Sequence, residues 1–327
     1  MGYENHSKLS EQLKNAYNVA DKIVEDYDLI IYEQFFFLGK HFAKKHAKPV
    51  VRIFTAPVTN KKLMEEYILA GGALGIFKYR WICRRWTKKV AKDIPMKTDC
   101  WLDEIVENPP DLNLVYTLKE YQPYVNDFPE EQYIFLGASI YARKEQEIDF
   151  KKNNRPLIYI SLGTVIKGGV AFFNKCMEAF RNEDLDVIIS VGKGFPINKL
   201  KNVPDNYRIY DYVPQLAVLK RAHVFVTHGG MNSINEALSL GVAMVVIPFM
   251  SDQPTNARRI EELGLGKKLD FHMINSDLLR TTVLSVMNDK VIASNVLRIQ
   301  KLMADAPGNS EGATMIIDYY RRLMSKH

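Results

Sequence analysis

The chain has 327 residues, of which 47% are hydrophobic and 25% are charged. At about 100–200 residues per domain this length suggests two domains, and the composition excludes a disordered protein. There are 44 Lys and Arg against 38 Asp and Glu. Seven of these cations lie in residues 78–92, a segment that contains no acid. Because the excess charge is confined to one segment, the sequence argues against a protein that binds nucleic acid over a large face.

The cysteines and the N-terminus indicate a cytoplasmic protein. Cys83, Cys100 and Cys176 are scattered and have no histidine at ligand spacing, which excludes a disulfide scaffold and argues against a structural zinc site. The polar N-terminus has no apolar stretch of the kind found in secretory signals. No run reaches the roughly 18 apolar residues that a membrane-spanning helix needs.

In the first half of the chain, helical patterns alternate with short apolar runs. The predicted elements are helices at 7–25 and 35–47, strands at 28–32 and 49–54, a helical stretch at 61–92, and strands at 113–117 and 132–137. This β-α-β alternation indicates a parallel sheet. The polar, charged and aperiodic segment 141–156 is interpreted as a linker between two domains.

The alternation restarts after the linker. Strands are predicted at 157–162, 186–191, 207–210, 223–227 and 243–247, and helices at 169–181, 214–221, 231–240, 253–263, 276–288, 290–304 and 311–325. The pattern predicts two doubly wound α/β domains in tandem. Because such sheets bind ligands at the carboxyl ends of their strands, the turns that follow these strands are the candidate sites.

The turn after the strand at 223–227 has the pattern most typical of a diphosphate site. In THGGMNSINE (227–236) a strand ends, two glycines form a tight turn and a helix begins, and the free N–H groups and positive end of a helix suit a diphosphate. Asn232 and Ser233 add side-chain donors, and His228 can hydrogen-bond a phosphate oxygen. Glu236 lies one turn further along the same helix face, where a carboxylate can accept both hydroxyls of a ribose.

Two other turns add weaker signals. In SLGT (161–164) a glycine and hydroxyls at a strand end allow the backbone to approach an anion closely. In PFMSDQPTNA (248–257), Asp252 and Gln253 present acceptors and donors together, as binding of a sugar requires. The alternative interpretation of Asp252 is that it caps the helix at 253–263.

Residues 213–269 strongly resemble the donor-binding signature of family 1 UDP-glycosyltransferases, especially the bacterial macrolide-glycosyltransferase-like group, and YISLGT at 159–164 matches as well. The resemblance implies a GT-B fold, in which two Rossmann-like domains face each other across a cleft, with the donor on the C-terminal domain and the acceptor on the N-terminal one. The expected domains are a partial acceptor-side domain at 1–145, a donor-binding domain at 146–310 and a last helix at 311–327 that packs back on the N-terminal domain.

The resemblance also implies a role for each matching residue. It assigns Val213 and Gln215 to the uracil, Glu236 to the ribose, and Thr164, His228, Gly230, Asn232 and Ser233 to the diphosphate. It assigns Asp252 and Gln253 to the hydroxyls of the donor sugar, in an arrangement of glucose type. Similar enzymes use no metal and no cofactor, since the UDP-sugar is a co-substrate; the nearest approach to a metal-binding DxD motif, Asp184-Leu185-Asp186, is interpreted as a helix-to-strand connection.

The sequence departs from the family at its start. Family members open with a strand and an H-x-x-P turn whose histidine is the general base of an inverting reaction, and no such segment is found here, so the catalytic residue stays unassigned. About two β-α units, roughly 60–80 residues at ~30 per β-α-β unit, are expected to be absent from the N-terminal domain. A positioned base contributes about 10²–10⁴-fold, so the chain alone is expected to be slow or inactive. His6, His41 and His46 could replace it, but His41 and His46 are better explained as ordinary helix residues and His6 as part of a frayed N-terminus.

Three functions follow from this departure. The first is a glycosyltransferase that moves a hexose, glucose by its motif, to a hydroxyl of an apolar small molecule, either as one chain or as one subunit completed by a partner chain. The second is a nucleotide-sugar-binding pseudoenzyme. The third is another UDP-sugar reaction on the same fold, such as epimerisation, against which the Asp252-Gln253 pair and the spacing of Glu236 argue.

The basic segment has two interpretations. Within 76–92, aromatic and aliphatic residues, Trp81 and Trp86 among them, alternate with the seven cations. Such a helix could lie on an anionic membrane surface, which would make the protein peripheral at the membrane. Alternatively, its apolar side packs into the core of the domain and its charges are solvated.

Overall fold

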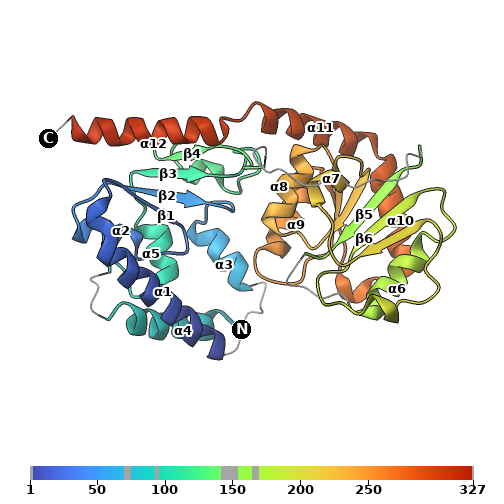
Figure 1. Cartoon of the computed structure of the whole chain (residues 1–327), viewed down its shortest axis with the longest axis horizontal. Coiled ribbons are helices and arrows are strands. Elements are labelled where there is room, and N and C mark those ends of the chain that lie inside the picture. Colours follow the sequence, from blue (N-terminus) through green and yellow to red (C-terminus); the bar gives the residue numbers. More distant parts are fainter. Residues whose placement is uncertain (1–2, 70–74, 93–95, 141–153, 164–168, 326–327) are drawn as a thin grey trace. The chain divides into compact units, whose positions relative to one another are not determined.

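The computed structural model describes residues 3–69, 75–92, 96–140, 154–163 and 169–325 (Figure 1). The chain forms two compact units, one comprising Met1–Gly137 and Ala306–His327 and the other Ala138–Asp305. The expected boundaries, at 145 and 310, lie a few residues later in both places. None of the described helices is long and apolar enough to cross a membrane.

The first unit is built on a sheet of four parallel strands in the order β1-β2-β3-β4, in which β1 and β4 are the edges. The strands are β1 (Ile30–Glu33), β2 (Val50–Phe54), β3 (Leu112–Val115) and β4 (Tyr133–Phe135); the helices are α1 (Tyr3–Ile23), α2 (Gly39–Lys45), α3 (Lys61–Leu69), α4 (Gly75–Val90) and α5 (Trp101–Glu107), with short 3₁₀ turns at Val24–Asp26 and Val125–Asp127. The stretch at 61–92, predicted as helical, therefore contains two separate helices. Helix α5 was not predicted, because a helix of seven residues is too short to show a clear period.

The last helix, α12 (Gly308–Met324), returns to this sheet. Tyr319 is buried in a cluster with Leu112, Leu114 and Leu136 of the sheet, and the N–H of Gly308 donates to the carbonyl of Leu136 at 2.9 Å. Figure 1 shows α12 on one side of β1–β4 and α1, α2 and α5 on the other. The second boundary lies at residue 306 because α12 belongs to the first unit from its first turn.

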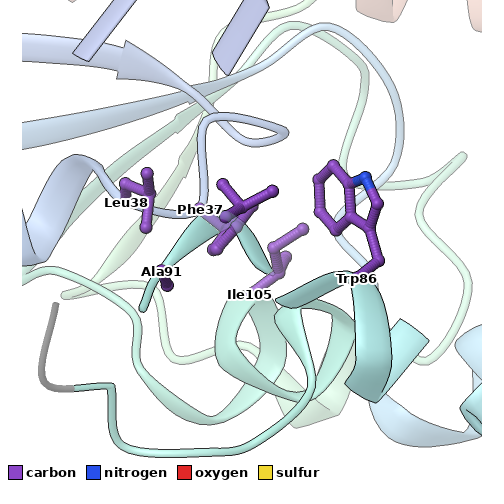
Figure 2. Close-up of a cluster of buried hydrophobic side chains, with 6 residues drawn as sticks. Phe37, Leu38, Trp86, Ala91 and Ile105 are labelled. Carbon is purple, nitrogen blue, oxygen red and sulfur yellow. The ribbon is translucent and has the colours of Figure 1, made fainter. Parts of the chain in front are cut away.

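Helices α4 and α5 and the turn before α2 enclose an aromatic cluster. It comprises Phe37, Leu38, Trp86, Val90, Ala91 and Ile105 (Figure 2). The Phe37 and Trp86 rings lie 5.7 Å apart, and Trp101 packs against both. In the described part of α4, the side facing this cluster is buried, whereas the cations Arg84, Arg85, Lys88 and Lys89 are exposed. The structure thus supports the interpretation of the basic segment as a helix with its apolar side in the core. Among the apolar side chains that the structure describes in α4, Trp81 is the exposed one, and the Arg85 guanidinium lies 5.4 Å from its ring centre.

A disulfide joins α4 to the start of α5. Cys83 and Cys100 are both buried, and their Cα atoms lie 5.7 Å apart. One bridge is not a disulfide scaffold, but the pairing was not predicted from the sequence. The 17 residues of separation show no motif, so only the packing of α4 on α5 brings the two side chains together.

The second unit is a doubly wound α/β sheet with six parallel strands in the order β10-β9-β8-β5-β6-β7. The strands are β5 (Leu157–Ser161), β6 (Asp186–Ser190), β7 (Tyr207–Tyr210), β8 (Val224–Thr227), β9 (Ala243–Val246) and β10 (Gly266–Lys268); the helices are α6 (Val170–Ala179), α7 (Gln215–Leu219), α8 (Met231–Ser239), α9 (Gln253–Glu262), α10 (Ser276–Asn288) and α11 (Lys290–Ala304), with 3₁₀ turns at Ile197–Lys199 and Phe271–Met273. Read from β7, this is the 3-2-1-4-5-6 order of dinucleotide-binding folds. The central strands are continuous apolar runs because helices cover both faces of the sheet (Figure 1). Strand β10, a Gly-Lys-Lys edge, has no apolar pattern and was not predicted.

Candidate functional site at the carboxyl ends of β5, β8 and β9

The strand order of the second unit places its switch point between β5 and β8. These strands pair in parallel with Ser161 opposite Thr227, so the turns that follow them lie side by side. Gly163 and Gly229 have φ angles of +77° and +85°, which only glycine adopts without strain. The sequence folds locally in this way because a buried strand ends in a hydroxyl residue and the next residues include a glycine that can turn the chain.

The His228 side chain lies between the two turns. A Cβ added at Gly163 would lie 2.6 Å from Cε1 of His228, and one added at Gly230 would lie 2.6 Å from its Nε2. The ring therefore fits only because both neighbours are glycines. Burial lowers the pKa of His228 to about 4, so the imidazole is neutral at neutral pH, and its buried Nδ1 has no hydrogen-bond partner among the described residues.

Helix α8 starts three residues after this histidine, at Met231. Gly230 is its N-cap and has no side chain with which to cap it, so the N–H groups of the first turn are available to a ligand. Asn232 is exposed and Ser233 is half-buried on that turn. The positive end of the helix dipole, free N–H groups and a neutral imidazole together favour an anion such as a diphosphate.

A hydrogen-bond network ties α7 to α8 on one side of this turn. The Gln215 amide donates to Glu236 Oε2 at 2.7 Å and to the Ser233 hydroxyl at 3.2 Å. The Tyr159 hydroxyl donates to Gln215 Oε1 at 3.2 Å. The Glu236 side chain is thereby held in a buried position. Val213, just before α7, is also buried, so it can offer a ligand only its backbone groups.

The turn between β9 and α9 lies on the other side. Asp252 occupies the N-cap position of α9, yet its carboxylate caps no helix N–H; instead it accepts from the Asn256 amide at 2.8 Å. The alternative in which Asp252 acts as a simple cap is therefore wrong. Burial raises the pKa of Asp252, while the bonds from Asn256 and Ser251 oppose the shift. Ser251 has a φ angle of +60°, a strained conformation of the kind found at binding sites.

The side chain of Gln253 bonds to the backbone of the turn, so only part of it is available to a ligand. Its Oε1 accepts the backbone N–H groups of Phe249 at 2.9 Å and Met250 at 3.2 Å, so its carbonyl oxygen closes the turn itself. Only its amide nitrogen remains for a sugar hydroxyl.

The structure brings most of the predicted residues together, but two further residues of the site, Asn256 and Tyr159, were not predicted. Asn256 donates to both Asp252 and the Gly229 carbonyl, the latter at 2.9 Å, and so joins the β9 turn to the glycine turn. Its position four residues after Asp252 on a helix was a signal that could have identified it. Tyr159 left no such signal, because it lies inside a buried strand. The predicted Thr164 lies outside the described residues.

The three histidines considered as substitute bases lie in the first unit. His41 Nε2 lies 2.7 Å from Glu104, and His46 Nε2 lies 2.8 Å from Asp21, so both are engaged within the fold; the side chain of His6 lies outside the described part. Asp184 and Asp186 stand at the connection from α6 into β6, as expected. Within the described residues no group of three or more His, Cys, Asp or Glu could hold a metal ion.

Comparison with known proteins adds to this geometry. Residues 143–322 match the family model described as UDP-glucoronosyl and UDP-glucosyl transferase. The chain is 33% identical over 316 residues to the NDP-glycosyltransferase YjiC of Bacillus subtilis (strain 168), which covers 95% of this chain and 78% of that protein. It is 28% identical over 319 residues to the oleandomycin glycosyltransferase of Streptomyces antibioticus, covering 94% and 72%. A solved structure described as the glycotransferase of kitacinnamycin superposes with a TM-score of 0.80 at 26% identity, covering 95% of this chain and 80% of that one.

Proposed function

The chain belongs to the family of UDP-glucoronosyl and UDP-glucosyl transferases and has the GT-B fold, and we propose that its second unit binds a UDP-sugar at the switch point between β5 and β8. We propose further that it transfers the hexose, with inversion, to a hydroxyl of an apolar small molecule. The observation that carries the donor site is the His228 ring, held between Gly163 and Gly230 at the free N-terminus of α8.

The diphosphate would lie at the start of α8. There the first-turn N–H groups, the side chains of Asn232 and Ser233 and a neutral His228 can donate to phosphate oxygens. Charge develops on UDP as its bond to the sugar breaks, so donors that already point at the phosphates stabilise the transition state without rearranging. Thr164 is proposed beside the β-phosphate.

The nucleoside would extend along the network between α7 and α8. Glu236, already placed by Gln215 at 2.7 Å, would accept the ribose hydroxyls. Gln215 and the backbone of Val213 would contact the uracil. Since Gln215 also contacts Ser233, this network couples the base and ribose subsites to the diphosphate turn.

The sugar would contact Asp252 and Gln253. Asp252 is fixed by Asn256, and Gln253 keeps its amide nitrogen for a hydroxyl while its oxygen closes the turn. A carboxylate and an amide side by side suit adjacent hydroxyls of a hexose such as glucose. No metal or further cofactor is proposed, and the general base that accepts the acceptor's proton stays unassigned.

For the acceptor and for the location of the protein, only a broad class is inferred. Two relatives are named for glycosyl transfer on oleandomycin and kitacinnamycin, which supports an apolar, hydroxylated small molecule as the acceptor here. A cytoplasmic location stays a prediction from the sequence, and the Cys83–Cys100 disulfide argues against it, because disulfides are rare in reducing compartments. Within the described part of segment 76–92, Trp81 is the aromatic side chain exposed for contact with a membrane. The relatives carry glycosyltransferase names, and no observation favours the catalytically silent alternative.

The donor site is tested by titrating the chain with UDP in a calorimeter. Hydrogen bonds to a charged group contribute about 1.5–3 kcal/mol, so Glu236→Gln should weaken UDP binding about tenfold or more. Glu262→Gln removes an exposed carboxylate that pairs with Arg258 and Arg259 on the surface of α9, and it should leave the affinity unchanged. Absence of UDP binding to the unmodified chain would refute the proposal.

A second titration assigns Glu236 to the ribose. UDP that lacks the 2′-hydroxyl should bind the unmodified chain more weakly than UDP, but should bind Glu236→Gln nearly as well as UDP does, because the lost partners are the same pair. If the loss of affinity from Glu236→Gln and the loss from the missing 2′-hydroxyl simply add, Glu236 does not contact the ribose. In the same format, Asp252→Asn should weaken UDP-glucose more than UDP.

A further inference from the structure

The first unit contains a cavity of about 1080 Å³ that the proposed donor site does not use. Tyr17 of α1, His41 of α2 and Asn108 after α5 line it. Lys40 donates to the carbonyl of Pro109, and Asn108 and Pro109 precede the amino end of β3. The cavity therefore lies towards the amino ends of the strands, whereas doubly wound sheets bind their substrates at the carboxyl ends.

The wall of this cavity is strongly cationic. Its lysines are Lys14, Lys40, Lys44, Lys45, Lys92 and Lys97, and no acid lines it among the described residues. So many like charges around one space repel each other, and a bound anion would relieve that repulsion.

Three of the lysines already have partners within the protein. Lys45 pairs with Asp21 at 2.5 Å, while the Nζ atoms of Lys40 and Lys97 each donate to a backbone carbonyl at 2.6 Å. Lys14 and Lys44 have no hydrogen-bond or ion-pair partner in the described part of the chain. Burial lowers the pKa of Lys40, as do the nearby Arg52 and Lys97, against the opposing effects of Asp111 and Glu104. The site thus has both fixed and free cations.

The buried acid behind the wall, Glu104, offsets only part of this positive charge and holds two of the lining residues in place. The carboxylate of Glu104 accepts from His41 at 2.7 Å, from the Thr98 N–H at 3.0 Å and from the Asn108 amide. Burial would raise its pKa, but these three bonds together lower it. Glu104 is therefore ionised and fully engaged in positioning His41 and Asn108.

Asn18, His41 and Asn108 add polar groups to the lining, and its remaining residues are apolar. Leu38 and Val90 belong to the aromatic cluster, and Tyr17 and Met96 complete the surface. In Figure 2, Phe37 lies between Leu38 and Trp86, so Leu38 stands at the end of a packed core. An apolar floor with a rim of lysines matches a ligand that has an apolar body and an anionic head.

We propose that this cavity binds a small anionic amphiphile, with its phosphate or carboxylate head at Lys14, Lys40 and Lys44 and its apolar body against Leu38, Tyr17 and Met96. This site is separate from the donor site and independent of whether the chain binds UDP. Its ligand is a free small molecule, not a membrane surface.

Calorimetry of the full chain with decyl phosphate, below the concentration at which it aggregates, tests the proposal. We expect one molecule bound per chain, and at least tenfold weaker binding of both inorganic phosphate and decanol. Lys14→Gln combined with Lys44→Gln should weaken decyl phosphate about tenfold or more, because charge-assisted bonds are lost. Lys88→Gln combined with Lys89→Gln removes the same charge from exposed positions of α4 outside the cavity and should have no effect.

A space-filling variant separates the cavity from general charge effects. Asn18→Trp keeps every lysine but occupies the cavity from α1, and it should abolish decyl phosphate binding while UDP titration and circular dichroism stay unchanged. Equal losses in the two lysine pairs, or unaltered binding to Asn18→Trp, would overturn the proposal. So would binding only to phosphatidylglycerol vesicles and not to monomeric decyl phosphate.

Discussion

At the scale of single residues, the position of the His228 ring depends on the absence of a side chain at two neighbouring positions. Gly163 and Gly230 lack a Cβ, and the His228 ring occupies the space that either Cβ would need. Side chains at both positions would have to displace the ring or the backbone, so the glycines and the histidine form one unit. The cost of this arrangement is a buried imidazole that cannot take up a proton easily.

This burial predicts a pH dependence of stability. The folded pKa of His228 is about 4 and the unfolded one about 6.5, so between these pH values the unfolded chain binds a proton that the folded chain does not. Stability from this group is therefore full above pH 6.5 and is lost as the pH falls towards 4, by about 3 kcal/mol at most. Urea unfolding across this range should show a steeper loss for the unmodified chain than for His228→Asn, which cannot titrate. Parallel curves would contradict the buried, neutral histidine.

At the scale of elements, α4 shows that the charge of a helix does not by itself predict whether the helix lies on a membrane surface. Its cations suggested a membrane surface, yet Trp86 and Val90 are buried in the aromatic cluster and Cys83 is joined to Cys100. The exposed lysines and arginines are then the solvated face of an amphipathic helix. The cationic cavity beside it draws its lysines mainly from α1 and α2, not from the exposed face of α4.

The disulfide should contribute measurably to the stability of the first unit. A bridge that closes a loop of about this length stabilises a fold by about 3 kcal/mol, mainly by restricting the unfolded chain. Urea unfolding of the unmodified protein should therefore show a loss of that size on adding a thiol reductant. Cys83→Ala combined with Cys100→Ala is the control, since it retains Cys176 and should not respond. An equal response in both proteins would show that the bridge is not the cause.

At the scale of the whole molecule, the chain consists of two units with separate cores, and the last helix joins the first of them. Tyr319 on α12 packs against Leu112 and Leu114, which are far away in the sequence. The packing of the first unit therefore depends on segments from the first and the last part of the sequence. The proposed donor site lies entirely within the second unit.

Differential scanning calorimetry should resolve this division. Tyr319→Ala removes a buried aromatic ring and should destabilise the first unit by about 3 kcal/mol, lowering one transition only. UDP at about 100 times its dissociation constant should stabilise the second unit by about 2.7 kcal/mol and raise the other transition. Tyr320→Ala, next on the same helix and outside this cluster, should shift neither transition by more than a fraction of that amount. A single transition that both changes move together would contradict two independent units.

The sequence by itself determined what is local. Apolar runs such as 157–162 and 223–227 predicted buried parallel strands, and THGGMNSINE contains a strand end, a turn and a helix start within ten residues. Such features follow from the period of the chain and from the conformations that glycine permits, so they can be predicted without an alignment. Short or polar elements such as α5 and β10 could not be, because they carry too little pattern.

Only the tertiary structure decided which distant residues meet. It placed His228 against Gly163, Gln215 against Glu236, and Asn256 against the Gly229 carbonyl. It also paired Cys83 with Cys100 and gathered six lysines around one cavity. These contacts depend on strand order and on how helices pack, and a packing surface is formed by segments whose separation along the chain has no fixed period.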